Sequence, residues 1–99
     1  MNVYLNRHFE NDQEYYAFAA LNDSSRQMRE VATKRLDDQD VLERIALYDS
    51  EPYVREAAIV KLNDRDILKK ISVEDDCRYN RLIASERRES LTEDGVFYW

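Results

Sequence analysis

The chain has 99 residues, of which 43% are hydrophobic, 36% are charged and 11% are aromatic, with a net charge of −6. It is too apolar and aromatic for a disordered chain, and its length fits one domain with a small core. The acidic balance argues against a surface that binds phosphate groups, so we do not expect a nucleic-acid partner.

The sequence predicts an all-α fold, because the residues that punctuate β-hairpins are nearly missing. Gly95 and Pro52 are the only glycine and proline. Cys77 is the only cysteine, so neither an intramolecular disulfide nor a cysteine-based zinc site is expected. No apolar run reaches the length of a membrane span, and the first ten residues lack a signal-peptide pattern. We therefore expect a cytoplasmic protein without a membrane partner.

A 26-residue repeat runs through most of the chain. Residues 23–48 align with residues 49–74, and ten of the 26 positions are identical. Residues 12–20 match residues 38–46, so they form the second half of an earlier unit, and residues 75–87 continue the pattern until Arg88 replaces an apolar residue. We expect one repeat domain with an N-terminal capping unit (1–22), two repeats (23–48 and 49–74) and a divergent C-terminal capping unit (75–99), because terminal units of a stack are atypical.

Each unit is predicted to contain two short helices. In the first full unit, apolar residues at spacings of three and four predict a helix from about 25 to 36, with Met28, Val31, Ala32 and Leu36 on its apolar face. A second helix is predicted from about 39 to 47. Asp38 and Asp64 precede the second helices and can cap them, Ser24 with Gln27 resembles a capping box, and Pro52 suits a first helical turn. Such short helices are marginal alone, so the stack is the folding unit.

The repeat resembles the bacterial HEAT-like repeats. The resemblance rests on an Asp, an apolar-Arg pair, small residues around an Ala, and then Leu, Asp, Leu and Ile-Ala at fixed offsets, and it covers residues 12–87. It implies a short right-handed α-solenoid of three to four helical hairpins. It also implies a ladder of ion pairs between units, formed by Asp23, Asp49 and Asp75 with Arg29, Arg55 and Arg81. The arginines could alternatively bind an anion, but a recurring Asp beside each one favours the structural role.

The second helices of the units carry the candidate binding surface. In HEAT-like stacks the corresponding helices usually line the concave side. Their positions outside the core form the rows Glu14/Asp40/Asp66, Ala17/Glu43/Lys69 and Phe18/Arg44/Lys70. These rows are acidic and aromatic at one end and basic at the other, and they describe either a solvated face or a binding face.

Aromatic residues gather near both ends of the sequence. Tyr15, Tyr16 and Phe97 suit the sealing of a terminal core, whereas Phe18 and Trp99 are equally suited to anchoring a partner. The predicted partner-binding residues are Phe18, Asp40, Glu43, Arg44, Asp66, Lys69, Lys70 and Trp99.

No reactive constellation is evident, so we expect neither a catalytic residue, a metal nor a cofactor. His8 is the only histidine, and the acidic clusters lack the glycine and the final glutamate of a calcium loop. Helix capping explains those acids better.

Three functions remain open, led by a non-enzymatic adaptor that binds a protein through the second helices. The alternative is a small acidic inhibitor of the phage or mobile-element type, which would occupy the nucleic-acid site of a basic protein through Asp37, Asp40, Asp64 and Asp66. The third is a small enzyme using His8 or Cys77. End-to-end stacking into a homo-oligomer is also open, because a stack has two ends.

Overall fold

The computed structural model describes residues 3–5 and 7–91, and within them it contains six α-helices and no β-strand, which confirms the all-α prediction. The helices are α1 (Asp12–Asn22), α2 (Arg26–Lys34), α3 (Gln39–Tyr48), α4 (Pro52–Ile59), α5 (Arg65–Glu74) and α6 (Arg78–Glu89). The expected helices at 25–36 and 39–47 correspond to α2 and α3. The predictions for Phe97 and Trp99 lie outside the described residues.

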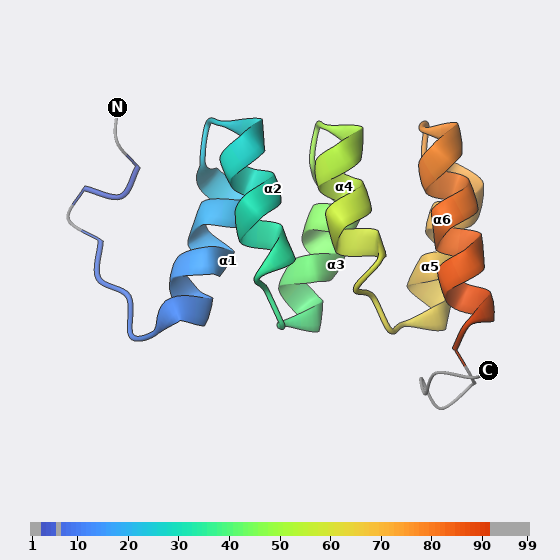
Figure 1. Ribbon diagram of the computed structural model, residues 1–99, viewed down its shortest axis with the longest axis horizontal. Coiled ribbons are helices and arrows are strands. Elements are labelled where there is room, and N and C mark those ends of the chain that lie inside the picture. Colours follow the sequence, from blue (N-terminus) through green and yellow to red (C-terminus); the bar gives the residue numbers. More distant parts are fainter. Residues whose placement is uncertain (1–2, 6, 92–99) are drawn as a thin grey trace.

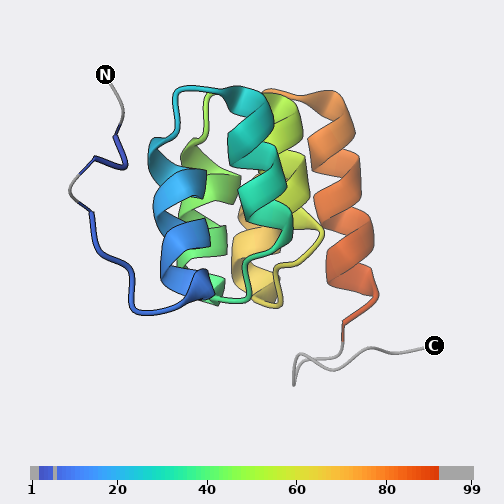
Figure 2. The same ribbon diagram turned by 60° about the vertical axis from the view of Figure 1, so that its left-hand side comes forward.

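The helices pack as three antiparallel pairs, α1 with α2, α3 with α4, and α5 with α6 (Figure 1). Figure 2 shows these pairs side by side, so that α1, α3 and α5 form one row (the α1 row) and α2, α4 and α6 form another (the α2 row). Each antiparallel pair therefore joins the second helix of one predicted unit to the first helix of the next. The pairs cross the unit boundaries at 22/23, 48/49 and 74/75 that the repeat alignment suggested.

The two rows differ in spacing. In the α2 row each helix packs directly against the next, whereas α1 and α3 make few contacts and α3 and α5 even fewer. The expectation that the second helices of the units line a concave side stays a prediction.

Side chains cap four of the six helices. Asp38 and Asp64 each accept hydrogen bonds from two backbone N–H groups of the first turn of α3 and α5, as expected. Asn11 caps α1, and Ser25 caps α2 by accepting from the N–H of Met28. The expected capping box beginning at Ser24 is therefore wrong by one residue. Pro52 occupies the first turn of α4, where its missing N–H costs nothing.

The core runs through the middle of the stack. Leu36, Leu42, Val54 and Leu68 are fully buried, and Ala84 closes the core on α6. The predicted apolar face of α2 is only partly correct: Ala32 and Leu36 are buried, but the other two members, Met28 and Val31, are exposed. A spacing pattern identifies a helix face, but it does not show whether a neighbour covers that face.

A ladder of arginine and aspartate residues ties each helix pair to the next. Arg29 donates from Nε and Nη2 to the carboxylate of Asp49, 20 residues later, at 2.9 and 3.3 Å. Arg55 repeats this geometry with Asp75 at 3.0 and 3.1 Å, and it also reaches Asp76 at 2.7 Å. Such fork-to-carboxylate pairs fix both distance and orientation.

Each of these arginines also binds its own pair. Arg29 donates from Nη1 to the backbone carbonyl of Asp23 at 2.9 Å, and Arg55 donates to that of Asp49 at the same distance. The bond to Asp49 raises the pKa of Arg29. Burial alone would lower the pKa of Arg55, but Asp75 reverses this and raises it. One guanidinium thus joins two successive loops while remaining charged.

The ladder has a different partner at each end. Arg81 donates to the carbonyl of Asp75 at 2.7 Å as its equivalents do, but no carboxylate binds its fork among residues 3–5 and 7–91. At the other end, the Tyr4 hydroxyl donates to Oδ2 of Asp23 at 2.7 Å, where an arginine would be placed by the repeat. We call each bond from a side chain to one of the repeated aspartates a rung. Tyr4 therefore forms the first rung, and Arg81 forms none with a carboxylate of the described residues.

Glutamines close the opposite ends of the first two pairs. The Gln13 side chain donates to the carbonyl of Arg35 and accepts from the N–H of Asp37, both at 2.9 Å. Gln39 makes the equivalent bonds to the loop after α4, and Arg65 replaces it in the third pair by binding the carbonyl of Leu91. Each pair is therefore held at both of its ends.

We predict that Arg55→Ala lowers the free energy of unfolding by about 3 kcal/mol, because the change leaves the buried Asp75 carboxylate without its cation. The matched change Arg81→Ala removes one bond to a carbonyl and should cost about 1 kcal/mol or less. Urea unfolding followed by circular dichroism measures both values. Equal losses for the two variants would contradict the role of the ladder.

The pKa of Asp23 is lowered first by the hydrogen bond from Tyr4 and next by the N–H of Ser25. The ionised Asp23 stabilises the fold fully at pH values above its pKa in the unfolded chain, near 4. This stabilisation is lost as the pH falls through the lower pKa that Asp23 has in the folded chain.

Tyr4→Phe should therefore raise the pKa of Asp23 and lower stability at pH 7 by about 1 kcal/mol. Carboxyl NMR titration and urea unfolding measure the two effects. Tyr15→Phe, in the same aromatic cluster, serves as the control and should change neither quantity appreciably. An unchanged Asp23 pKa in Tyr4→Phe would refute this rung.

Candidate protein-binding surface

The α1 row carries the most exposed large hydrophobic side chain among the described residues. Tyr48 ends α3 with 75% of its surface exposed. So exposed a ring contributes little to the core, and tyrosine is enriched at the centres of protein interfaces. The surroundings of Tyr48 therefore form the first candidate site.

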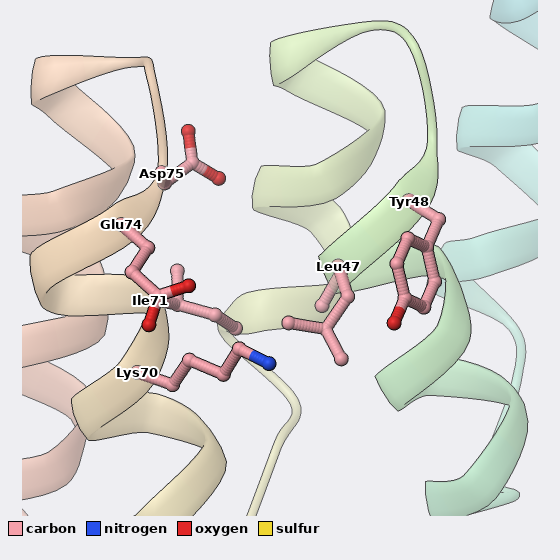
Figure 3. Close-up of a pocket in the computed structure, with 7 residues that line it drawn as sticks. Leu47, Tyr48, Lys70, Ile71, Glu74 and Asp75 are labelled. Atoms are coloured by element: carbon pink, nitrogen blue, oxygen red, sulfur yellow. The ribbon is translucent and has the colours of Figure 1, made fainter.

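A cleft of about 220 Å³ separates α3 from α5 on one side of Tyr48. Figure 3 shows Leu47 and Ile71 facing each other across this cleft, with Lys70 and Glu74 at its edge. The wider spacing of the α1 row leaves this space between the helices. Its apolar floor and charged edge can hold one apolar side chain of a partner and bind polar groups beside it.

A second cleft of about 340 Å³ lies between α1 and α3 on the other side of Tyr48. Ala20 and Leu21 from α1 face Arg44 and Ile45 from α3 across it. Tyr48 thus stands between two clefts that have the same architecture and are one repeat apart.

The charged groups at the clefts fall into two classes. Asp49 and Asp75 line the clefts but are already bound by Arg29 and Arg55 of the ladder. Two cationic side chains, Arg44 and Lys70, together with Glu74, make no ion pair with the other described residues. We name Arg44, Tyr48, Lys70 and Glu74 with the two clefts the Tyr48 surface.

The structure brings together only part of the predicted binding residues. Arg44 lines one cleft and Lys70 lines the other. Four further residues lie on α3 and α5 outside the clefts, and all are exposed except the half-buried Glu43; they are Asp40, Glu43, Asp66 and Lys69. Trp99 lies outside the described residues.

Phe18 is engaged within the chain. Its ring lies 5.6 Å from the rings of Tyr4 and Phe9, and the guanidinium of Arg7 lies 4.7 Å above it. The N-terminal segment thus covers this side of α1, with Tyr15 in the same cluster. For this reason we leave Phe18 out of the Tyr48 surface.

Sequence reasoning missed Tyr48 because the second helix was expected to end at residue 47. A signal was present, since Tyr48 is aromatic where the equivalent positions hold Asn22 and Glu74. A large apolar residue that appears in only one copy of a repeat has no part in the shared core.

The candidate reactive groups lie far apart in the stack. His8 precedes α1 and pairs at 3.5 Å with Glu10, where both side chains are exposed. Cys77 directly precedes α6, which lies at the other end of the stack (Figure 1). Its backbone N–H donates to Asp75. Among residues 3–5 and 7–91, no three His, Cys, Asp or Glu side chains are grouped as a metal site. No described helix is long and apolar enough to cross a membrane.

Comparisons with protein-family models, with curated proteins and with solved structures find no match to this chain.

Proposed function

We propose that the chain is a short right-handed α-solenoid of the HEAT-like kind and serves as a non-enzymatic protein-binding module. Support for the solenoid comes from the 26-residue repeat together with the repeated Arg–Asp rungs and the repeated glutamine bonds. Identical contacts at identical offsets are the property that makes a stack of units regular.

The observation that carries the binding function is the exposure of Tyr48 between two clefts. A partner that covers Tyr48 buries an aromatic ring on a rigid helix, so little conformational entropy is lost there. Two apolar side chains of the partner can enter the flanking clefts. The surface offers cations at Arg44 and Lys70 and an acid at Glu74, so a partner segment with apolar anchors and charges of both signs fits it best.

Tyr48→Ala should weaken binding of the partner by about 30- to 100-fold, which corresponds to the loss of a central aromatic anchor. The partner is obtained by affinity capture from the source cell with the wild-type chain and identified by mass spectrometry. Binding is then measured by calorimetry with purified proteins.

Tyr79→Ala is the matched control, because Tyr79 is also an exposed tyrosine but lies on α6 in the other row. The control should bind as the wild type does. The proposed surface is wrong if both variants bind equally well, or if Arg44→Glu combined with Lys70→Glu leaves the affinity unchanged while the fold is retained.

The acidic inhibitor is a second candidate, supported by exposed carboxylates at one edge of the stack. Asp37, Asp40 and Asp66 are exposed beside the starts of α3 and α5. Asp64 is exposed too, but it caps α5 and so has a structural role.

Changing Asp37, Asp40 and Asp66 to Asn should abolish salt-sensitive binding to a basic nuclease if the inhibitor proposal holds. The change should leave binding through the Tyr48 surface nearly intact. Binding to the nuclease that persists after neutralisation would refute electrostatic mimicry.

A further inference from the structure

We propose that copies of this chain associate head to tail, with α6 of one copy packed against α2 of the next and Arg81 bound to Asp23 of that next copy. The junction uses the two ends of the α2 row and leaves the Tyr48 surface uncovered. It is independent of the function proposed above.

The N-terminal end of the stack has a vacant apolar groove. A space of about 290 Å³ lies between α1 and α2, lined by Tyr15, Ala19, Met28 and Val31 among others. Met28 and Val31 are 47% and 46% exposed, whereas their equivalents on α4, Val54 and Ala57, are 0% and 6% exposed. The positions that the stack buries in its middle are therefore open at this end.

The C-terminal end presents a matching apolar group. Leu82 on α6 is 56% exposed, and the equivalent positions on α2 and α4 hold Glu30 and Glu56. A leucine replaces a glutamate only on the helix that has no further described helix beyond it. Leu82 follows Arg81 directly, so an apolar contact and a charge lie together on this end.

The fork of Arg81, which no carboxylate of the described residues binds, indicates which group a second copy would supply. In both complete rungs the arginine binds an aspartate that also accepts a hydrogen bond from the backbone N–H two residues later. Asp49 accepts from the N–H of Glu51, and Asp75 accepts from the N–H of Cys77. Asp23 has this same turn, since it accepts from the N–H of Ser25 at 2.8 Å. Asp23 of a second copy thus offers the carboxylate geometry that this arginine position binds twice within the chain.

Tyr4 occupies the site that Arg81 would take. Its hydroxyl donates to Oδ2 of Asp23, the equivalent of the oxygen that accepts from Arg29 in the first complete rung. The junction therefore requires Arg81 to displace the Tyr4 hydroxyl, so Tyr4 weakens the association.

The described residues of the N-terminal segment do not cover the whole end. Its described rings, Tyr4 and Phe9, pack on Tyr15 and Phe18 of α1. Successive pairs contact each other mainly through the α2 row. The described residues therefore leave uncovered the side of α2 that α6 of a second copy would contact.

Sedimentation equilibrium of the full chain, at concentrations from about 10 μM to 1 mM, tests the proposal. The wild type should associate reversibly and grow beyond dimers, since a head-to-tail contact does not close on itself unless it forms a ring. Arg81→Glu and Asp23→Asn should each remain monomeric. Mixing these two variants should restore a one-to-one pair, because Arg81 of one meets Asp23 of the other. Tyr4→Phe should associate about tenfold more tightly than the wild type.

Arg44→Glu makes the same charge change on α3 and should leave the association unchanged. The proposal is overturned if the wild type and Tyr4→Phe both stay monomeric, or if Arg81→Glu associates as the wild type does. Loss of association in Arg44→Glu alone would overturn it as well, by assigning the contact to the Tyr48 surface. If the chain stayed monomeric and instead bound a different helical protein through Arg81, the C-terminal end would serve that partner and the proposal would be wrong.

Discussion

The rest of the structure depends on the arginine that joins two loops at once. Arg29 and Arg55 each bind a carbonyl of their own helix pair and a carboxylate of the next. A largely buried guanidinium is tolerated only when its donors are satisfied, so both contacts must form together. This requirement fixes how far apart successive pairs lie and how they are oriented, which hydrophobic contact between short helices would leave variable.

Features that depend on local spacing could be predicted from the sequence. The caps at Asp38 and Asp64 and the buried Leu36 and Leu42 follow from patterns within a single unit. The sequence could not show which two successive helices form the closest pair. A repeat of two helices looks the same whether a unit is counted from its first helix or from its second. The exposure of Met28 and Val31 also escaped prediction, since their spacing matches that of a buried face and only their place at the end of the stack exposes them.

Positions where the copies differ are the informative ones for function. Tyr48 stands where the other units hold Asn22 and Glu74, and Leu82 stands where they hold glutamates. A residue shared by all copies is sufficiently explained by packing, caps or rungs. A large apolar residue that is present in one copy and exposed there has no such explanation, and for this reason the two proposed surfaces were placed at Tyr48 and Leu82.

The two proposed surfaces are related by the geometry of the stack. The Tyr48 surface lies on the α1 row, whereas the head-to-tail junction uses the ends of the α2 row, so one contact leaves the other free. A junction that copies the internal rung would continue the stack and repeat the Tyr48 surface along it. Repeated surfaces on one assembly bind a repeated partner more tightly than any single surface does, because later contacts form at high effective concentration. Because Tyr4 competes with Arg81 for Asp23, it would set the protein concentration above which copies associate and bind the repeated partner more tightly.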